Sequence, residues 1–87
     1  MNNEEFLKQF SLIENRLLSM APDFDPKQKF LNLLKYLHSN RLVSDELITI
    51  LQEIFQTRNK IMSSRSGIST PSNIEKKIQK TIKDLNI

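Results

Sequence analysis

Two places in this chain carry residues that could do chemistry: the pair Arg58-Asn59, near the end of a predicted helix, and the lone histidine, His38. Acid–base catalysis without a metal needs a side chain that moves protons near neutral pH, and imidazole is the usual one. The residues after Arg58 read NKIMSSRS and contain no histidine. A serine with no base beside it cannot take that role. His38 is typical of a helix-end cation, so we expect no catalytic residue and no enzyme activity.

Composition removes several further classes of site. The chain has no cysteine, which excludes a disulfide, a thiolate zinc site and a cysteine nucleophile. A single histidine excludes a multi-histidine metal site within one chain. The only glycine, Gly67, cannot form a glycine-rich phosphate loop. We therefore expect neither a metal nor a cofactor.

The elements that must position these residues are helices. Apolar residues recur at helical spacing in four segments, which predict helices over about 3–20, 26–39, 45–62 and 73–86. The 87 residues form one domain, residues 1–87, and short connections favour an all-α, four-helix, up-and-down bundle. No stretch approaches the roughly 20 apolar residues of a membrane span. The start MNNEEFLKQF is not a secretory signal, so we expect a cytoplasmic protein that does not enter membranes.

Polar residues predict where these helices begin. Asn2 or Asn3 can cap the first, Asp25 followed by proline opens the second, and Ser44 caps the third. Ser72-Asn73-Ile74-Glu75 matches a capping box for the fourth. The expected buried stripes are Phe6, Phe10, Ile13, Leu17 and Met20; Phe30, Leu33, Leu34 and Leu37; Leu47, Ile50, Leu51, Ile54, Phe55, Ile61 and Met62; and Ile74, Ile78, Ile82 and Leu85.

Two charges fall inside these stripes. On a helical wheel, Arg58 lies between Leu47 and Leu51, in the middle of the apolar arc of its helix. Glu14 lies inside the arc of the first helix, beside Phe10. Because an unpaired buried charge costs several kcal/mol, we predict a structural ion pair between Glu14 and Arg58. An alternative is that Arg58 simply interacts with the free carbonyls at its helix end.

A family resemblance rests on these same residues. The third helix with its terminal Arg58-Asn59, the polar loop and the capped fourth helix resemble the HEPN superfamily. Ile13-Glu14, and the second helix followed by Arg41-Leu42-Val43-Ser44, are similar to small bacterial HEPN-like domains. The resemblance covers most of the chain, on short and degenerate motifs.

The resemblance implies a specific departure from the nuclease pattern. In active members an arginine is followed about four to six positions later by histidine, and two paired chains line a cleft that cleaves RNA. Here that histidine falls at Met62, Ser63 or Ser64, most naturally Ser63. The resemblance thus implies a non-catalytic, dimeric interaction or regulatory module, in a toxin–antitoxin or defence context. An RNA endonuclease toxin with an unconventional proton carrier remains an alternative.

The basic end suggests another alternative, a small nucleic-acid-binding adaptor. From Arg58 to Lys83 there are seven basic residues and one acid, so RNA or an acidic protein could bind there. The candidate surface is Arg65, Lys76, Lys77, Lys80 and Lys83. These lysines equally fit an ordinary solvated helix face.

Surplus apolar residues suggest a partner. Ile48, Phe55 and Met62 form one edge of the third helix, and Leu31 adds to the outer side of the second. We predict a dimer surface at Ile48, Phe55 and Met62, with a homodimer or another protein as partner. The alternative is that close packing within the bundle covers these residues.

Overall fold

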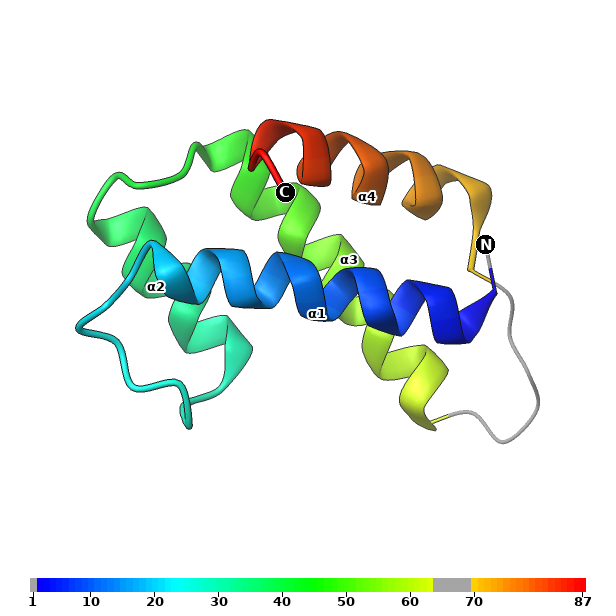
Figure 1. Cartoon of the computed structure of the whole chain (residues 1–87), viewed down its shortest axis with the longest axis horizontal. Helices are drawn as coiled ribbons and strands as arrows, with labels where there is room; N and C mark the ends of the chain where they lie inside the picture. The colour runs from blue at the N-terminus through cyan, green and yellow to red at the C-terminus, as the bar shows by residue number, and fades with distance from the viewer. Residues whose placement is uncertain (1, 64–69) are drawn as a thin grey trace.

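The chain folds into helices packed around one apolar core. The computed structural model describes residues 2–63 and 70–87, which contain α1 (Asn3–Ser19), α2 (Phe30–Ser39), α3 (Asp45–Ser63) and α4 (Ser72–Asp84), and no strand in those ranges (Figure 1). This confirms the all-α class and the four helices. α1 and α3 each pack against all three other helices, whereas α2 and α4 make no contact with each other in the described part. α1 and α3 therefore each contact α2 on one side and α4 on the other.

The core is built from the predicted stripes. The buried apolar side chains are Phe6, Phe10, Ile13, Leu17, Ala21, Phe30, Leu33, Leu34, Leu37, Val43, Leu51, Ile54, Ile61, Ile74, Ile78 and Leu85. Five predicted members are only half-buried: Met20, Leu47, Ile50, Phe55 and Ile82. Met62 differs most, because 59% of it is exposed. It lies in the last turn of α3, where the helix extends past most of its neighbours (Figure 1).

Two of the predicted caps are confirmed. The Asn2 side chain accepts a hydrogen bond from the Glu5 backbone N–H at 2.7 Å, and the Ser44 hydroxyl accepts one from Leu47 at 3.1 Å. Each cap satisfies an N–H group that has no partner within its own helix.

The predicted start of α2 is wrong by four residues. Asp25 does not cap the helix; its side chain accepts from the Lys27 N–H at 2.9 Å and its carbonyl accepts from Gln28 at 3.1 Å. Those bonds close a separate turn, after which Lys29 is extended and α2 begins at Phe30. Aspartate serves a turn as well as a cap, and the turn wins here.

The predicted capping box of α4 is also wrong. Pro71 occupies the N-cap position, and its carbonyl accepts from the N–H groups of Ile74 and Glu75 at 3.1 and 3.0 Å. Ser72 is the first helical residue, and the N-cap residue, Pro71, makes no side-chain cap hydrogen bond. The extended backbone of Pro71, with φ −59° and ψ 143°, sets the start of the helix.

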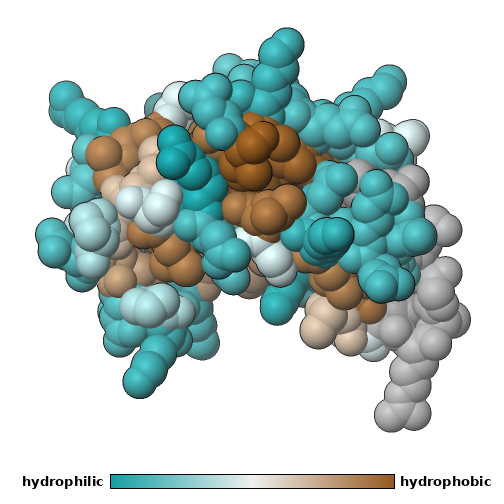
Figure 2. All heavy atoms as spheres, in the orientation of Figure 1, coloured by the Kyte–Doolittle hydropathy of each residue, from teal (hydrophilic) through white to brown (hydrophobic). Residues whose placement is uncertain are grey.

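The end of the chain lies against α1. The Arg16 side chain of α1 donates a hydrogen bond from Nε to the Leu85 carbonyl at 3.0 Å. On the face of the molecule shown in Figure 2, apolar residues gather between α1 and the end of α4, and hydrophilic residues surround them. Within the described ranges, no helix is both long and apolar enough to cross a bilayer.

Candidate interaction surface on α2 and α3

An apolar surface lies on α2 and α3, where two hollows share Leu31. The first hollow, of about 250 Å³, is lined by Leu31, Leu34, Lys35, His38, Ile48 and Gln52. The second, of about 380 Å³, is lined by Glu14, Lys29, Phe30, Leu31, Phe55 and Arg58. We call these residues together the α2–α3 surface. Leu31 is 44% exposed and belongs to both hollows, so it forms the ridge between them.

Three aromatic rings from three helices meet at the second hollow. Phe55 stacks on Phe30 with ring centroids 5.0 Å apart and an interplanar angle of 20°. Phe10 lies 5.1 Å from Phe30 and 6.3 Å from Phe55. Such ring pairs add roughly 0.5–1.5 kcal/mol beyond the area they bury. The wall of this hollow is therefore held rigidly by α1, α2 and α3 together.

Arg58 lies half-buried at the same hollow. Its guanidinium carbon is 5.6 Å from the centroid of the Phe10 ring, and Nη1 donates a hydrogen bond to the Asn59 side chain at 3.2 Å. Glu14 lines this hollow too and is also half-buried. The ion pairs found among the described residues do not include Glu14 with Arg58, so that pairing stays a prediction. The ring and the amide both contact the cation and stabilise it.

The remaining motif residue, Ser63, faces its own helix. Its hydroxyl donates to the Lys60 carbonyl at 3.2 Å. Asn59 is exposed and accepts from Arg58. In the described part of the chain, no group of three histidine, aspartate or glutamate residues could hold a metal. The groups placed around Arg58 are thus the Phe10 ring, the Asn59 amide and, in the same hollow, the Glu14 carboxylate.

His38 has a partner that sequence reasoning missed. Its Nε2 is hydrogen-bonded to a carboxylate oxygen of Asp45, which joins the last turn of α2 to the first residue of α3. The pair spans a five-residue connection, 40–44, in which Arg41 has φ 55°. The short connection between a helix-end histidine and a helix-start acid is the signal that could have found it.

The basic residues of α4 are divided between solvent and α3. Lys77 forms an ion pair with Glu53, and Lys80 forms one with Glu46 at 3.2 Å. Lys76 and Lys83 are exposed, and Arg65 lies outside the described residues. Because two of these lysines already contact carboxylates, the candidate nucleic-acid surface is less positive than the sequence suggests; it stays a prediction.

The predicted dimer residues are divided in a similar way. Ile48 lines the first hollow and Phe55 the second, and both are half-buried. Met62 is exposed at the end of α3 and lines neither hollow. Leu31, on the other helix, joins the two sites.

Comparison with protein-family models, with curated proteins and with solved structures gave no match. The function must therefore be argued from this surface and from the residues around Arg58.

Proposed function

We propose that the chain is a non-catalytic, HEPN-like interaction module that pairs with a second copy through the α2–α3 surface. The observation that carries the proposal is the ridge at Leu31: an exposed leucine between two adjoining, largely apolar hollows. Exposed apolar surface that is shaped in this way is typical of a protein–protein contact.

The position of Leu31 between the two hollows fits a second copy as the partner. A two-fold pair uses the same patch on both chains, so the two ends of the patch exchange across the axis. With the axis at Leu31, each leucine ridge meets its counterpart. The end that carries Glu14, Lys29 and Arg58 then faces the end that carries Lys35 and His38. Of the residues that line the two hollows, Glu14 is the only acid, so it can pair with Lys35 across the axis, while Lys29 and Arg58 leave the second hollow positive.

The absence of a proton carrier after Arg58 supports the non-catalytic part of the proposal. In nucleases of the family that this chain resembles, the arginine works with a histidine. Here the corresponding position is Ser63, whose hydroxyl is bonded to the Lys60 carbonyl. On this proposal, Arg58 is an interface residue that stabilises the wall of the second hollow.

A matched pair of substitutions tests the proposal. Leu31 and Leu12 are both 44% exposed, but only Leu31 lines the hollows. Light scattering across a concentration series should show a dimer for the unaltered chain and for Leu12→Arg, and a monomer for Leu31→Arg. Circular dichroism should show that all three are equally helical. A monomer at every concentration for the unaltered chain, or the same loss in Leu12→Arg, would contradict the proposal.

A charge exchange tests the orientation of the pair. Glu14→Lys should weaken dimerisation by roughly two- to fivefold, because it sets like charges against each other. Adding Lys35→Glu to the same chain should restore most of the loss. Failure of that rescue, with Leu31→Arg still monomeric, would show that the copies pair in another orientation. The same samples should leave structured RNA uncut; cleavage that Arg58→Ala abolishes would favour the endonuclease alternative.

A further inference from the structure

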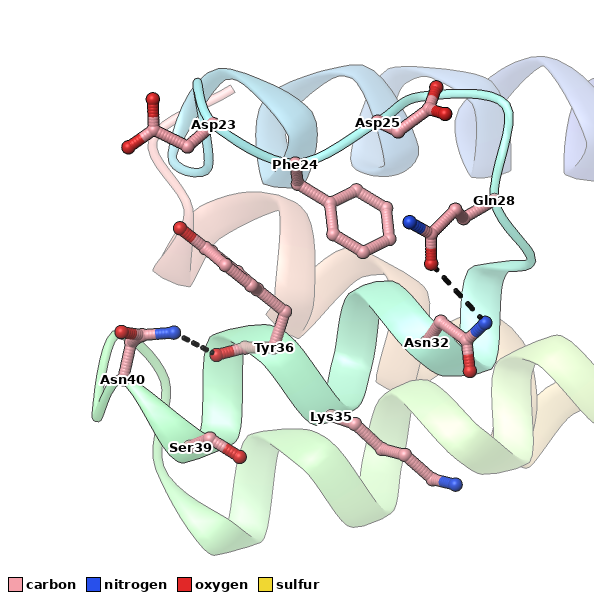
Figure 3. A pocket seen from close by; sticks show the side chains of 9 residues that line it. All are labelled: Asp23, Phe24, Asp25, Gln28, Asn32, Lys35, Tyr36, Ser39 and Asn40. Carbon is pink, nitrogen blue, oxygen red and sulfur yellow. Dashed lines mark hydrogen bonds between the residues drawn. The ribbon is translucent and has the colours of Figure 1, made fainter.

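A second, chemically different pocket lies where the α1–α2 connection folds over α2. It encloses about 510 Å³ and is lined by Asp23, Phe24, Asp25, Gln28, Asn32, Lys35, Tyr36, Ser39 and Asn40 (Figure 3). Phe24 and Tyr36 form its aromatic part, and the other lining residues are polar or charged. Only Lys35 is shared with the α2–α3 surface, so this pocket lies on a neighbouring face of α2.

Local hydrogen bonds fix the connection in place. The Phe24 N–H donates to the carbonyl of the buried Ala21 at 3.0 Å, and the turn closed by Asp25 follows directly. The first turn places the Phe24 ring against Tyr36, with centroids 5.5 Å apart and an angle of 55°. In Figure 3 the two rings lie between the connection and α2. The pocket therefore exists before any ligand arrives.

The lining favours a cation over an anion. Two carboxylates, Asp23 and Asp25, stand at the connection, against one ammonium group, that of Lys35. Within the described part of the chain, the Asp23 carboxylate makes no hydrogen bond or ion pair, and Asp25 uses one oxygen for its own turn. The Lys35 side chain extends away from the two rings and also lines the first hollow of the α2–α3 surface (Figure 3). The faces of Phe24 and Tyr36 also favour a cation, because the quadrupole of an aromatic ring is negative at its face.

We propose that this pocket binds the guanidinium group of an arginine side chain carried by a partner polypeptide. A guanidinium is planar, stacks on aromatic faces and carries five N–H donors, whereas lysine presents a compact ammonium with three. The lining also carries the carboxylates of Asp23 and Asp25, which lie on either side of Phe24 and point away from the rings in Figure 3. Gln28, Asn32 and Asn40 add amide groups, and the Gln28 oxygen already accepts from Asn32 at 3.5 Å. The chain already holds one guanidinium in this way, with Arg58 over the Phe10 ring.

The N-terminal turn of α1 offers an internal comparison. A hollow of about 350 Å³ there is lined by Asn2, Glu4, Glu5 and Lys8. Like the first pocket, it has two acids and one lysine, and it has one amide, but no aromatic ring lines it. If the rings of Phe24 and Tyr36 matter, arginine should select the first pocket and ignore this one.

The experiment is an NMR titration of the full chain with the capped tripeptide Gly-Arg-Gly. Matched tripeptides carry lysine or citrulline, the neutral isostere of arginine, and adenosine monophosphate serves as an anionic aromatic probe. We expect amide shifts between Ala21 and Asn40 that saturate with arginine and are several-fold weaker with the other three. The proposal is overturned if no probe shifts these amides, if citrulline or lysine matches arginine, or if the nucleotide binds more tightly.

Variants locate the site. Tyr36→Leu should weaken arginine binding by roughly two- to fivefold, as expected for loss of an exposed cation–π contact. The double change Asp23→Asn with Asp25→Asn should weaken it at least as much, and it keeps an acceptor for the Lys27 N–H, so the turn is retained. The control, Glu4→Gln with Glu5→Gln, should bind as the unaltered chain does. Loss of binding in that control, or unchanged binding in the Asp23 and Asp25 variant, would overturn the proposal.

Discussion

α3 packs against α4 on one flank and against α2 on the other, and different residues border the two contacts. On the flank that meets α4, buried Ile74 and Ile78 are bordered by ion pairs to Glu53 and Glu46. On the flank that meets α2, Leu33, Leu34 and Leu37 are equally buried, yet the border is the exposed Leu31 with a hollow on either side. Both contacts are sound helix–helix packing. They differ because ion pairs border the contact with α4, whereas an exposed leucine between two hollows borders the contact with α2.

That difference has a physical consequence. Charged rims are satisfied by water and by each other, so covering them with a further protein requires desolvation with little gain. An apolar rim gains from being covered, at roughly 25 cal/mol for each Å² removed from water. The flank toward α4 is therefore complete within one chain, and the flank toward α2 is where we expect a partner.

The largest effect should come from shortening a buried side chain on the flank of α3 that meets α4. Ile78 is fully buried, so Ile78→Ala should lower the free energy of unfolding by about 2–5 kcal/mol. Ile48 is half-buried on the flank that meets α2, so Ile48→Ala should lower the free energy of unfolding by less than half as much. Urea denaturation in the Leu31→Arg background measures both without a contribution from pairing. Equal losses would remove the distinction between the flanks.

A smaller effect is expected from substituting Arg58, which lies on the flank of α3 that meets α2. Arg58→Met keeps most of the side-chain length but removes the cation over Phe10, and should cost about 0.5–1 kcal/mol of stability. Lys60→Met is the control, because Lys60 is an exposed cation on the same helix. The same urea experiment compares them. If Arg58→Met is no worse than the control, the contact with Phe10 does not stabilise the fold.

The smallest effect should come from the charged rim. Lys77→Met breaks the ion pair with Glu53 and should cost under about 1 kcal/mol, since both side chains are partly exposed. Lys76→Met, next along α4 and exposed, should cost nothing measurable. Repeating both unfolding curves at about 1 M salt should erase the difference, because screening then acts over a few Å. A cost that persists at high salt would mean that packing, not charge, makes this contact.

Much of the fold follows from local patterns in the chain. The four helices, the buried stripe of α2 and the caps at Asn2 and Ser44 depend on residues within a few positions of one another. The errors are local as well. Asp25 and Ser72 each had two competing uses, and the choice depended on how the neighbouring backbone was already bonded.

The sequence by itself determined the chemistry that Arg58 lacks: no histidine follows it, whatever the fold. It also determined which faces of the helices are apolar. Only the tertiary structure decided that Arg58 lies over Phe10, that Lys77 and Lys80 contact α3, and that Leu31 joins two hollows. The periodicity of a helix shows which residues share a face. The partner of that face is set by packing between segments far apart in the chain, which no local pattern encodes.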